Sequence, residues 1–177
     1  QETMQGGGKA SYSIPKGDTV IGFCLESYDD TAKAWLGRSG HYLQNPPPGC
    51  LFCVSVRRTA PDLFGTMTPS GERVGMVLVG RPVARMLPQD GSWGEITRLV
   101  LVDGLPHGTA SNLLRFVFSS SWRRGLSTVI SYHDRSRHTG CIYRKAGMRK
   151  DGATTPSGKG WASRDRPMSA QTGQTSK

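Results

Sequence analysis

The 177-residue chain is predicted to fold as a single α/β domain with a central mixed sheet flanked by helices. Short apolar runs alternate with segments of helical periodicity, and 177 residues suffice for one domain with terminal segments to spare. A helical stripe over 109–125 lies between two such runs, 95–104 and 126–134. This is the order of a strand–helix–strand crossover, whose helix must pack on the sheet.

Five strands are expected, at 20–27, 51–58, 73–83, 95–104 and 126–134. The segment 73–83 is apolar throughout, as in a buried strand, whereas 95–104 alternates well enough to be a central strand. The last strand, 126–134, ends in polar side chains. We therefore expect Asp134 at the end of a central strand, a common location for working groups in open α/β sheets.

Three helices are expected, at 29–40, 109–125 and 140–148. The first follows capping acids and ends at Gly40, and the second carries an apolar stripe that ends at Gly125. The third turns at Gly147.

The domain boundaries follow composition. Residues 1–18 are expected to be a flexible N-terminal segment, 19–168 the folded domain, and 169–177 a disordered tail. The sequence contains no run of 18 apolar residues, so no membrane span is predicted. The N-terminal residues lack the apolar centre of a signal peptide. The expected location is the cytoplasm, where the four cysteines would be reduced thiols.

Cys50 and Cys53 have the C-x-x-C spacing that can bind zinc or perform redox chemistry. A structural zinc site needs a second such pair, and none follows. The favoured interpretation is two small apolar residues at the start of a buried strand.

The formal charge of +10 favours a polyanionic partner, because lysine and arginine that neutralise phosphates release counterions. A solvated basic surface is the alternative. Between 135 and 166, nine basic residues face two aspartates, which leaves +7 in this stretch. Trp161 lies among these cations and is expected either to stack on an unpaired base or to cap the sheet.

The loop over 103–111 delivers backbone amides to a helix N-terminus, where the amides and the helix dipole suit a phosphate or pyrophosphate. Within it, His107, Gly108 and Thr109 are candidate cofactor-binding residues. An ordinary strand–helix turn, capped by Thr109 or Ser111, is the equal alternative.

The densest group of reactive side chains follows the last strand, with two histidines, two tyrosines and Asp134 between 130 and 143. Histidine can move protons near neutral pH or bind a metal, and tyrosine can donate a proton. A second segment offers His41 and Tyr42, in a loop that three consecutive prolines stiffen. A polar loop without function is the alternative.

Several pieces in register resemble the Mom family of bacteriophage DNA-modification enzymes. They are the early His41-Tyr42, 75–80, 95–99, 129–134 with the loop to His138 and Gly140, 141–143, and 160–164 followed by Arg166. The likeness spans roughly 28–166 and implies a divergent GNAT acetyltransferase-like fold. It implies transfer of a carbamoyl or acyl-type group to the exocyclic N6 amine of adenine in DNA, which protects phage DNA from host restriction.

Carried over by position, the resemblance makes His41, Tyr42, Asp134 and Tyr143 the catalytic set and Arg98 a cofactor-binding residue. Iron is associated with the family, and His41, Tyr42 and Asp134 would be its ligands. Double-stranded DNA is the expected partner, and its expected binding residues are Arg135, Arg137, Arg144, Lys145, Lys159, Trp161, Arg164 and Arg166. No membrane partner is expected, and the oligomeric state stays open, a homodimer included.

The group donor is left open by the sequence. The acyl-coenzyme A loop of ordinary GNAT enzymes, Q/R-x-x-G-x-G/A, is absent, and residues 106–110 occupy its place, which counts against acetyl-coenzyme A as the donor. An acyl-coenzyme A-like donor stays one alternative. Two other functions compete with DNA modification. One is a GNAT-type N-acetyltransferase acting on a protein or small-molecule amine, and the other is a DNA-binding domain without enzymatic activity.

Overall fold

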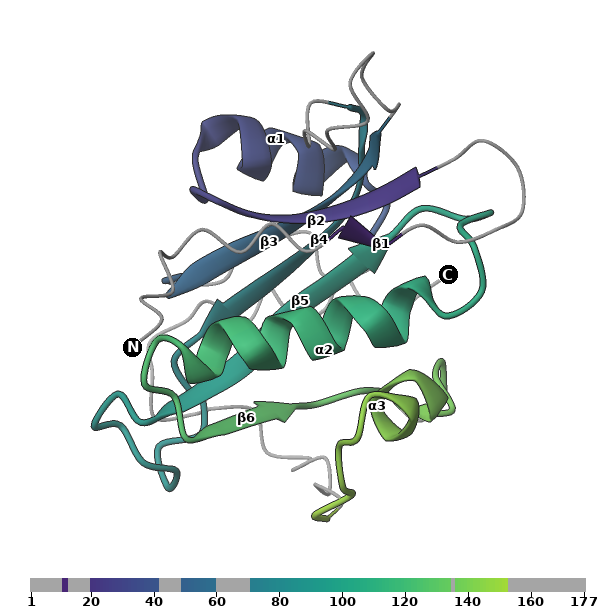
Figure 1. Cartoon of the computed structure of the whole chain (residues 1–177). Helices are drawn as coiled ribbons and strands as arrows, with labels where there is room; N and C mark the ends of the chain where they lie inside the picture. The colour runs from purple at the N-terminus through teal and green to yellow at the C-terminus, as the bar shows by residue number, and fades with distance from the viewer. Residues whose placement is uncertain (1–10, 13–19, 42–48, 60–70, 135, 153–177) are drawn as a thin grey trace, which may run out of the picture.

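The computed structural model describes residues 11–12, 20–41, 49–59, 71–134 and 136–152 (Figure 1). The strands are β1 (Ser11–Tyr12), β2 (Val20–Glu26), β3 (Phe52–Thr59), β4 (Arg73–Gly80), β5 (Trp93–Leu101) and β6 (Thr128–Ser131). The helices are α1 (Asp30–Arg38), α2 (Thr109–Trp122) and α3 (Cys141–Lys145). The α/β class predicted from the sequence is confirmed.

The six strands form one sheet in sequence order, β1 to β6. Neighbouring strands are antiparallel except β5 and β6, which are parallel because α2 carries the chain back between them. The predicted crossover is therefore confirmed.

Helices cover both faces of the sheet (Figure 1). On one face, Ala32 and Leu36 of α1 pack in a core with Met76, Leu78 and Val100. We call this the α1 face. The other face holds the larger core and packs against α2 and α3. There the rings of Phe23 in β2 and Phe116 in α2 lie 5.8 Å apart.

The ends of several elements differ from the sequence prediction. The strand expected over 73–83 ends at Gly80, two residues before Pro82, which has no backbone amide to donate to a neighbouring strand. The strand expected over 95–104 lies two to three residues earlier, at 93–101. The last strand is only 128–131 and lies at the edge of the sheet, not at its centre, so Asp134 lies three residues beyond it.

The helices and the N-terminal segment also need small corrections. The helices α1, α2 and α3 are each shorter than expected, and α2 ends at Trp122 because Arg123 and Arg124 turn the chain toward Gly125, whose φ is +80°. The first eighteen residues, expected to be flexible, contain the two-residue strand β1, which pairs with Gly22 and Ile21 of β2. The expected tail over 169–177 lies outside the described residues.

A β-bulge in β5 determines how the sheet ends. Leu78 pairs with Arg98, but the next residue of β4, Val79, pairs with Ile96, so Thr97 is an extra residue in β5. A bulge bends its strand and increases the local twist. It lies immediately after Ile96, whose partner Ser131 is the last residue of β6 that pairs with β5.

Candidate active site

The strands β5 and β6 are paired only at their beginnings. Pairing runs from Trp93–Thr128 to Ile96–Ser131, and β5 then continues for five more residues without a described partner on that side. The edge of β5 over 97–101 therefore offers backbone N–H and C=O groups to an extended ligand. We call this segment the open edge of β5.

A buried polar atom lies at the point where the strands separate. The hydroxyl oxygen of Ser131 is buried and has no hydrogen-bond partner among the described residues. Buried hydroxyl groups in folded proteins nearly always have a partner, supplied by protein, water or a ligand. The position therefore suits a polar group of a bound molecule.

Glu95 is a buried carboxyl group on the α1 face, two residues before the bulge. Because Thr97 is the extra residue, Glu95 and Arg98 are neighbours on this face, while Ile96 and Leu99 pack in the other core. Glu95 is 7% exposed, and its Oε2 accepts a hydrogen bond of 2.8 Å from the amide of Val83. Burial raises the pKa of Glu95, against the opposing effects of this hydrogen bond and of Arg98.

A carboxyl group with a raised pKa at the end of a strand pairing is a candidate general base. Glu95 was not among the site residues expected from the sequence. The signal that could have found it is a single acid inside the apolar strand WGEITRLVL.

Arg98, expected to bind a cofactor, lies on the α1 face beside Glu95. Its Nη1 donates a hydrogen bond of 2.6 Å to the backbone oxygen of Thr97, the bulge residue. The arginine thus holds the bulge from the side opposite to α2.

The helix N-terminus beyond the open edge has the character expected of an anion site. Gly108, the N-cap of α2, has a φ of +90° and offers no side chain to cap the helix, and the first turn contains no acidic residue. The amide and hydroxyl groups of Thr109 both donate to the oxygen of Pro106, at 3.1 and 2.7 Å. The amides of Ala110 and Ser111 remain in the first turn, where a helix provides no internal acceptor. His107 is exposed.

Two aromatic side chains stack beyond the end of β6. The rings of His133 and Tyr143 lie 5.4 Å apart, nearly parallel, and Tyr143 also packs against the core under α2. The stack leaves no room at Gly140, where an added Cβ atom would lie 2.9 Å from Nε2 of His133. The sequence analysis named Tyr143 as catalytic and gave His133 no individual role.

Asp134 forms a turn in the loop that follows. Its Oδ1 accepts hydrogen bonds from the hydroxyl and amide of Ser136 at 2.6 and 2.8 Å, and its Oδ2 lies 3.4 Å from Nε of Arg137. The hydroxyl and then the amide of Ser136 lower the pKa of Asp134 below its usual value. A carboxylate with a lowered pKa is a weaker base, so this geometry favours a structural role.

The remaining predicted site residues lie apart or outside the described part of the chain. His41 follows α1, the helix on the opposite face from α3, which carries Tyr143. Tyr42 lies outside the described residues, as do Arg135, Lys159, Trp161, Arg164 and Arg166. Arg144 and Lys145 are exposed on α3 and Arg137 is exposed before it. Among the described residues, no group of three histidine, cysteine or acidic side chains could hold a metal ion.

Cys50 and Cys53 lie where the chain enters β3, and Cys53 packs in the core of the α1 face. Cys53 is fully buried in β3, and burial raises its pKa to about 12. The thiol of Cys50 donates to the oxygen of Phe52, and both cysteines are free. Cys53 therefore lies at the start of a buried strand, as the sequence predicted.

Several solved structures with a similar architecture are acetyltransferases. The aminoglycoside N-acetyltransferase AAC(6')-Iy, in complex with CoA, matches with a TM-score of 0.57 at 11% identity, over 83% of this chain and 99% of that chain. An aminoglycoside acetyltransferase from an uncultured soil metagenomic sample has a TM-score of 0.53 at 15% identity, over 79% and 99%. An acetyltransferase of Trypanosoma brucei has 0.50 at 16%, over 77% and 98%.

These likenesses show the fold: the chain has the GNAT-like α/β fold that the sequence predicted. No family model matches the chain, and no curated protein matches it either. Within the described residues, no helix is long and apolar enough to span a membrane.

Proposed function

We propose that this protein is an N-acyltransferase that moves an acyl group from an acyl-CoA thioester to an amine. The observation that carries the proposal is the separation of β5 and β6 at the bulge, which leaves the open edge of β5 for an extended donor. The match to an acetyltransferase in complex with CoA supports it.

The residues around the open edge fit an acyl-CoA donor in two places. The donor's pantetheine arm contains amide groups, which can hydrogen bond along the open edge as an added strand would. Its pyrophosphate suits the amides of Ala110 and Ser111 at the uncapped N-terminus of α2. Backbone amides make this contact, so the loss of the usual Q/R-x-x-G-x-G/A side chains at 106–110 does not prevent it.

Two side chains are assigned to proton transfer. An acyl-CoA thioester, when bound, supplies an activated acyl group. Glu95 accepts the proton that the acceptor amine loses as its nitrogen bonds to the acyl carbon. Tyr143 donates a proton to the sulfur as the carbon–sulfur bond breaks. Glu95 pairs with Ile130, one pair before β5 and β6 separate, and lies on the α1 face. Tyr143 lies beyond the end of β6 on the face that α2 covers, so the two side chains would reach the reacting atoms from opposite faces of the sheet.

The charge of the chain favours an anionic molecule as the acceptor that carries the amine. Arg137, Arg144 and Lys145 surround Tyr143 in sequence and are exposed, which suits an anionic acceptor better than a cationic one. DNA is such an acceptor, and the resemblance to the Mom family makes the N6 amine of adenine the proposed target. That amine is a poor nucleophile paired within the duplex, so the base would have to leave the stack.

Acetyl-CoA binding and transfer test the proposal together. We expect millimolar acetyl-CoA to raise the melting temperature by several degrees, because a ligand that binds only the folded state stabilises it. Release of free CoA should then depend on an added amine, tested with an aminoglycoside and with a deoxyadenosine oligonucleotide. Mass spectrometry of the product identifies the acceptor.

The Glu95→Gln variant provides the matched control. We expect its turnover to fall about a hundredfold or more, because general base catalysis is lost, while acetyl-CoA still raises its melting temperature. Since the pKa of Glu95 is raised, wild-type activity should fall with decreasing pH at a higher pH than an ordinary glutamate would give. Failure of acetyl-CoA to stabilise the wild-type protein would refute the donor assignment.

A further inference from the structure

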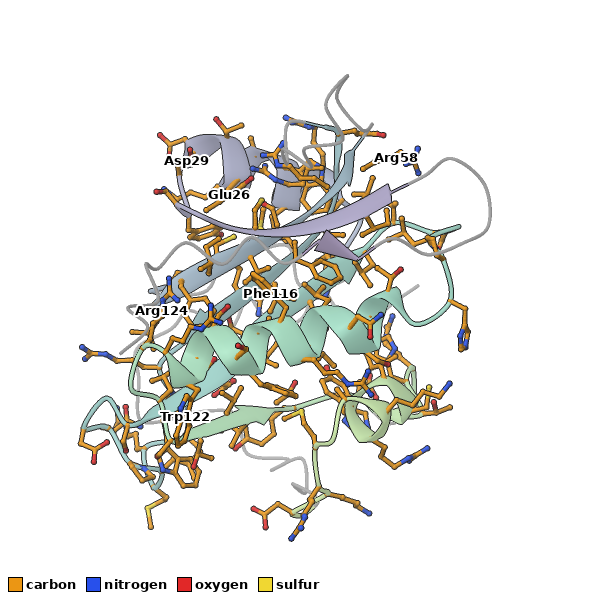
Figure 2. The ribbon with its side chains drawn as sticks, viewed as in Figure 1. Glu26, Asp29, Arg58, Phe116, Trp122 and Arg124 are labelled. Atoms are coloured by element: carbon orange, nitrogen blue, oxygen red, sulfur yellow. The ribbon has the colours of Figure 1, made fainter. Side chains whose placement is uncertain are left out.

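The β5–β6 pair begins at Trp93 and Thr128, and we call this its closed end. This end carries an exposed tryptophan and four arginines that the acyltransferase site does not use. They come from the loop between β4 and β5 and from the end of α2, and we call them the arginine–tryptophan surface: Arg81, Arg85, Trp122, Arg123 and Arg124. The two segments meet through Ser127, whose amide and hydroxyl donate to the oxygen of Ser92 at 2.8 and 3.1 Å. Figure 2 shows Trp122 and Arg124 at this end of α2.

Trp122 is unusual because it lies at the end of an amphipathic helix with its ring outside the core. Its side chain is 74% exposed, whereas Val117 and Leu114 of the same helix are fully buried. A large exposed aromatic side chain beside cations is a platform on which an unpaired base can stack.

The arginines give this surface a clear positive charge. Four arginines against Asp90 leave a formal charge of +3 over 81–92 and 122–127. No described acid forms a salt bridge with any of the four. Only Arg124 has an evident structural role, since it lies 4.8 Å over the ring of Phe52 and donates to the oxygen of Ser120.

These cations lie too far from the donor site to hold the phosphates of CoA. The proposed pyrophosphate site is at the N-terminus of α2, and Trp122 is the last of its 14 residues. At about 1.5 Å per residue, the helix separates the two ends by roughly 20 Å. The surface therefore suits a second, independent anion.

We propose that the arginine–tryptophan surface binds single-stranded nucleic acid, with Trp122 stacked on a base and the arginines on phosphates. An anionic membrane is the less suitable partner, because the exposed apolar side chains of Val83, Met86 and Trp122 are interrupted by the exposed polar residues Gln89, Asp90 and Ser119. The proposal does not depend on the acyltransferase activity.

Binding of a fluorescein-labelled oligothymidylate to the full chain, followed by fluorescence anisotropy, tests the proposal. Thymine has no exocyclic amine, so this probe cannot serve as an acyl acceptor. We expect Trp122→Ala to raise Kd about tenfold and Trp122→Phe to change it less, since phenylalanine keeps a ring for stacking. The double variant Arg85→Ala/Arg123→Ala should weaken binding and lower the slope of log Kd against log salt by about 1.4.

The control removes two exposed arginines elsewhere, as Arg38→Ala/Arg58→Ala, and should leave Kd within about twofold. Without any ligand, every variant should melt within a few degrees of wild type, which shows that each is folded. If Trp122→Ala binds the oligonucleotide like wild type, or if the two arginine pairs have equal effects, the proposal is wrong. Binding to phosphatidylserine vesicles in preference to the oligonucleotide would also overturn it.

Discussion

Glu26 shows at the scale of single residues how a charge can hold three strands together. Its carboxylate lies on the α1 face and contacts Arg57 of β3 at 2.6 Å and Arg73 of β4 at 2.7 Å, while the hydroxyl of Ser55 donates to it at 2.6 Å. Burial alone would raise the pKa of Glu26, but the hydrogen bonds from Ser55, Arg73 and Arg57 lower it to about 2.

The lowered pKa predicts a pH-dependent stability. Because the pKa of Glu26 in the folded state lies below the usual glutamate value of 4.5, the charged carboxylate stabilises the fold above pH 4.5, and this contribution is lost as the pH falls toward 2. Linkage gives about 3 kcal/mol at neutral pH. We expect Glu26→Gln to lower the free energy of unfolding by about that amount at pH 7 and by less than half of it at pH 3, measured by urea denaturation.

The exposed pair between Lys33 and Asp30 on α1 is the control for this experiment. Its atoms are 2.8 Å apart, but both side chains are solvated, so Asp30→Asn should change the unfolding free energy little at either pH. An effect of Glu26→Gln that is equally small would show that the buried network does not stabilise the sheet.

At the scale of elements, the N-terminus of α2 is arranged to bind rather than to be capped. Asp29 caps α1 by accepting a hydrogen bond of 2.8 Å from the amide of Ala32, whereas Gly108 gives α2 no such side chain. An uncapped helix N-terminus keeps its amides and its partial positive charge available to an anion.

Ala110→Asp separates helix stability from donor binding. An aspartate in the first turn interacts favourably with the helix dipole, so the melting temperature without ligand should stay the same or rise. The same charge should repel the phosphates of CoA, and we expect the Kd for acetyl-CoA to rise about tenfold or more, measured by calorimetry.

The neutral variant Ala110→Asn has nearly the same shape as Ala110→Asp and provides the matched control. It should bind acetyl-CoA within about threefold of wild type, because it adds no charge. Equal losses in the two variants would point to a steric effect and contradict an anion site at this helix end.

For the whole molecule, the structure separates two groups of anion-binding features. The N-terminus of α2 lies beyond the open end of the β5–β6 pair, and its C-terminus lies at the closed end (Figure 1). The arginine–tryptophan surface includes this C-terminus, where Figure 2 labels Trp122 and Arg124. One helix, α2, spans the distance between them. Within the described residues, the features that suit an anion therefore lie at both ends of α2.

This separation predicts that the two ligands do not compete. Saturating acetyl-CoA should leave the Kd for oligothymidylate within about twofold of its value without CoA, because roughly 20 Å of helix and salt screening separate the charges. Titration of the labelled oligonucleotide at constant ionic strength measures this. A large increase in Kd would mean that the ligands share one site.

The sequence by itself determined the order and type of the main elements. Apolar runs and one amphipathic stripe are local patterns, so the strands, the crossover helix α2 and the buried position of Cys53 followed from them. The likeness to GNAT enzymes carried the fold correctly. The roles of the predicted site residues stay predictions, and Tyr42 lies outside the described residues.

Only the tertiary structure decided which residues meet. The bulge at Thr97 is a shift in register between β4 and β5, and register depends on pairing between segments distant in sequence. That shift gives Glu95 and Arg98 a common face and separates β5 from β6, which creates the open edge. A carboxyl group acquires a raised pKa only when the fold buries it, so Glu95 could not be distinguished from other acids before its surroundings were known.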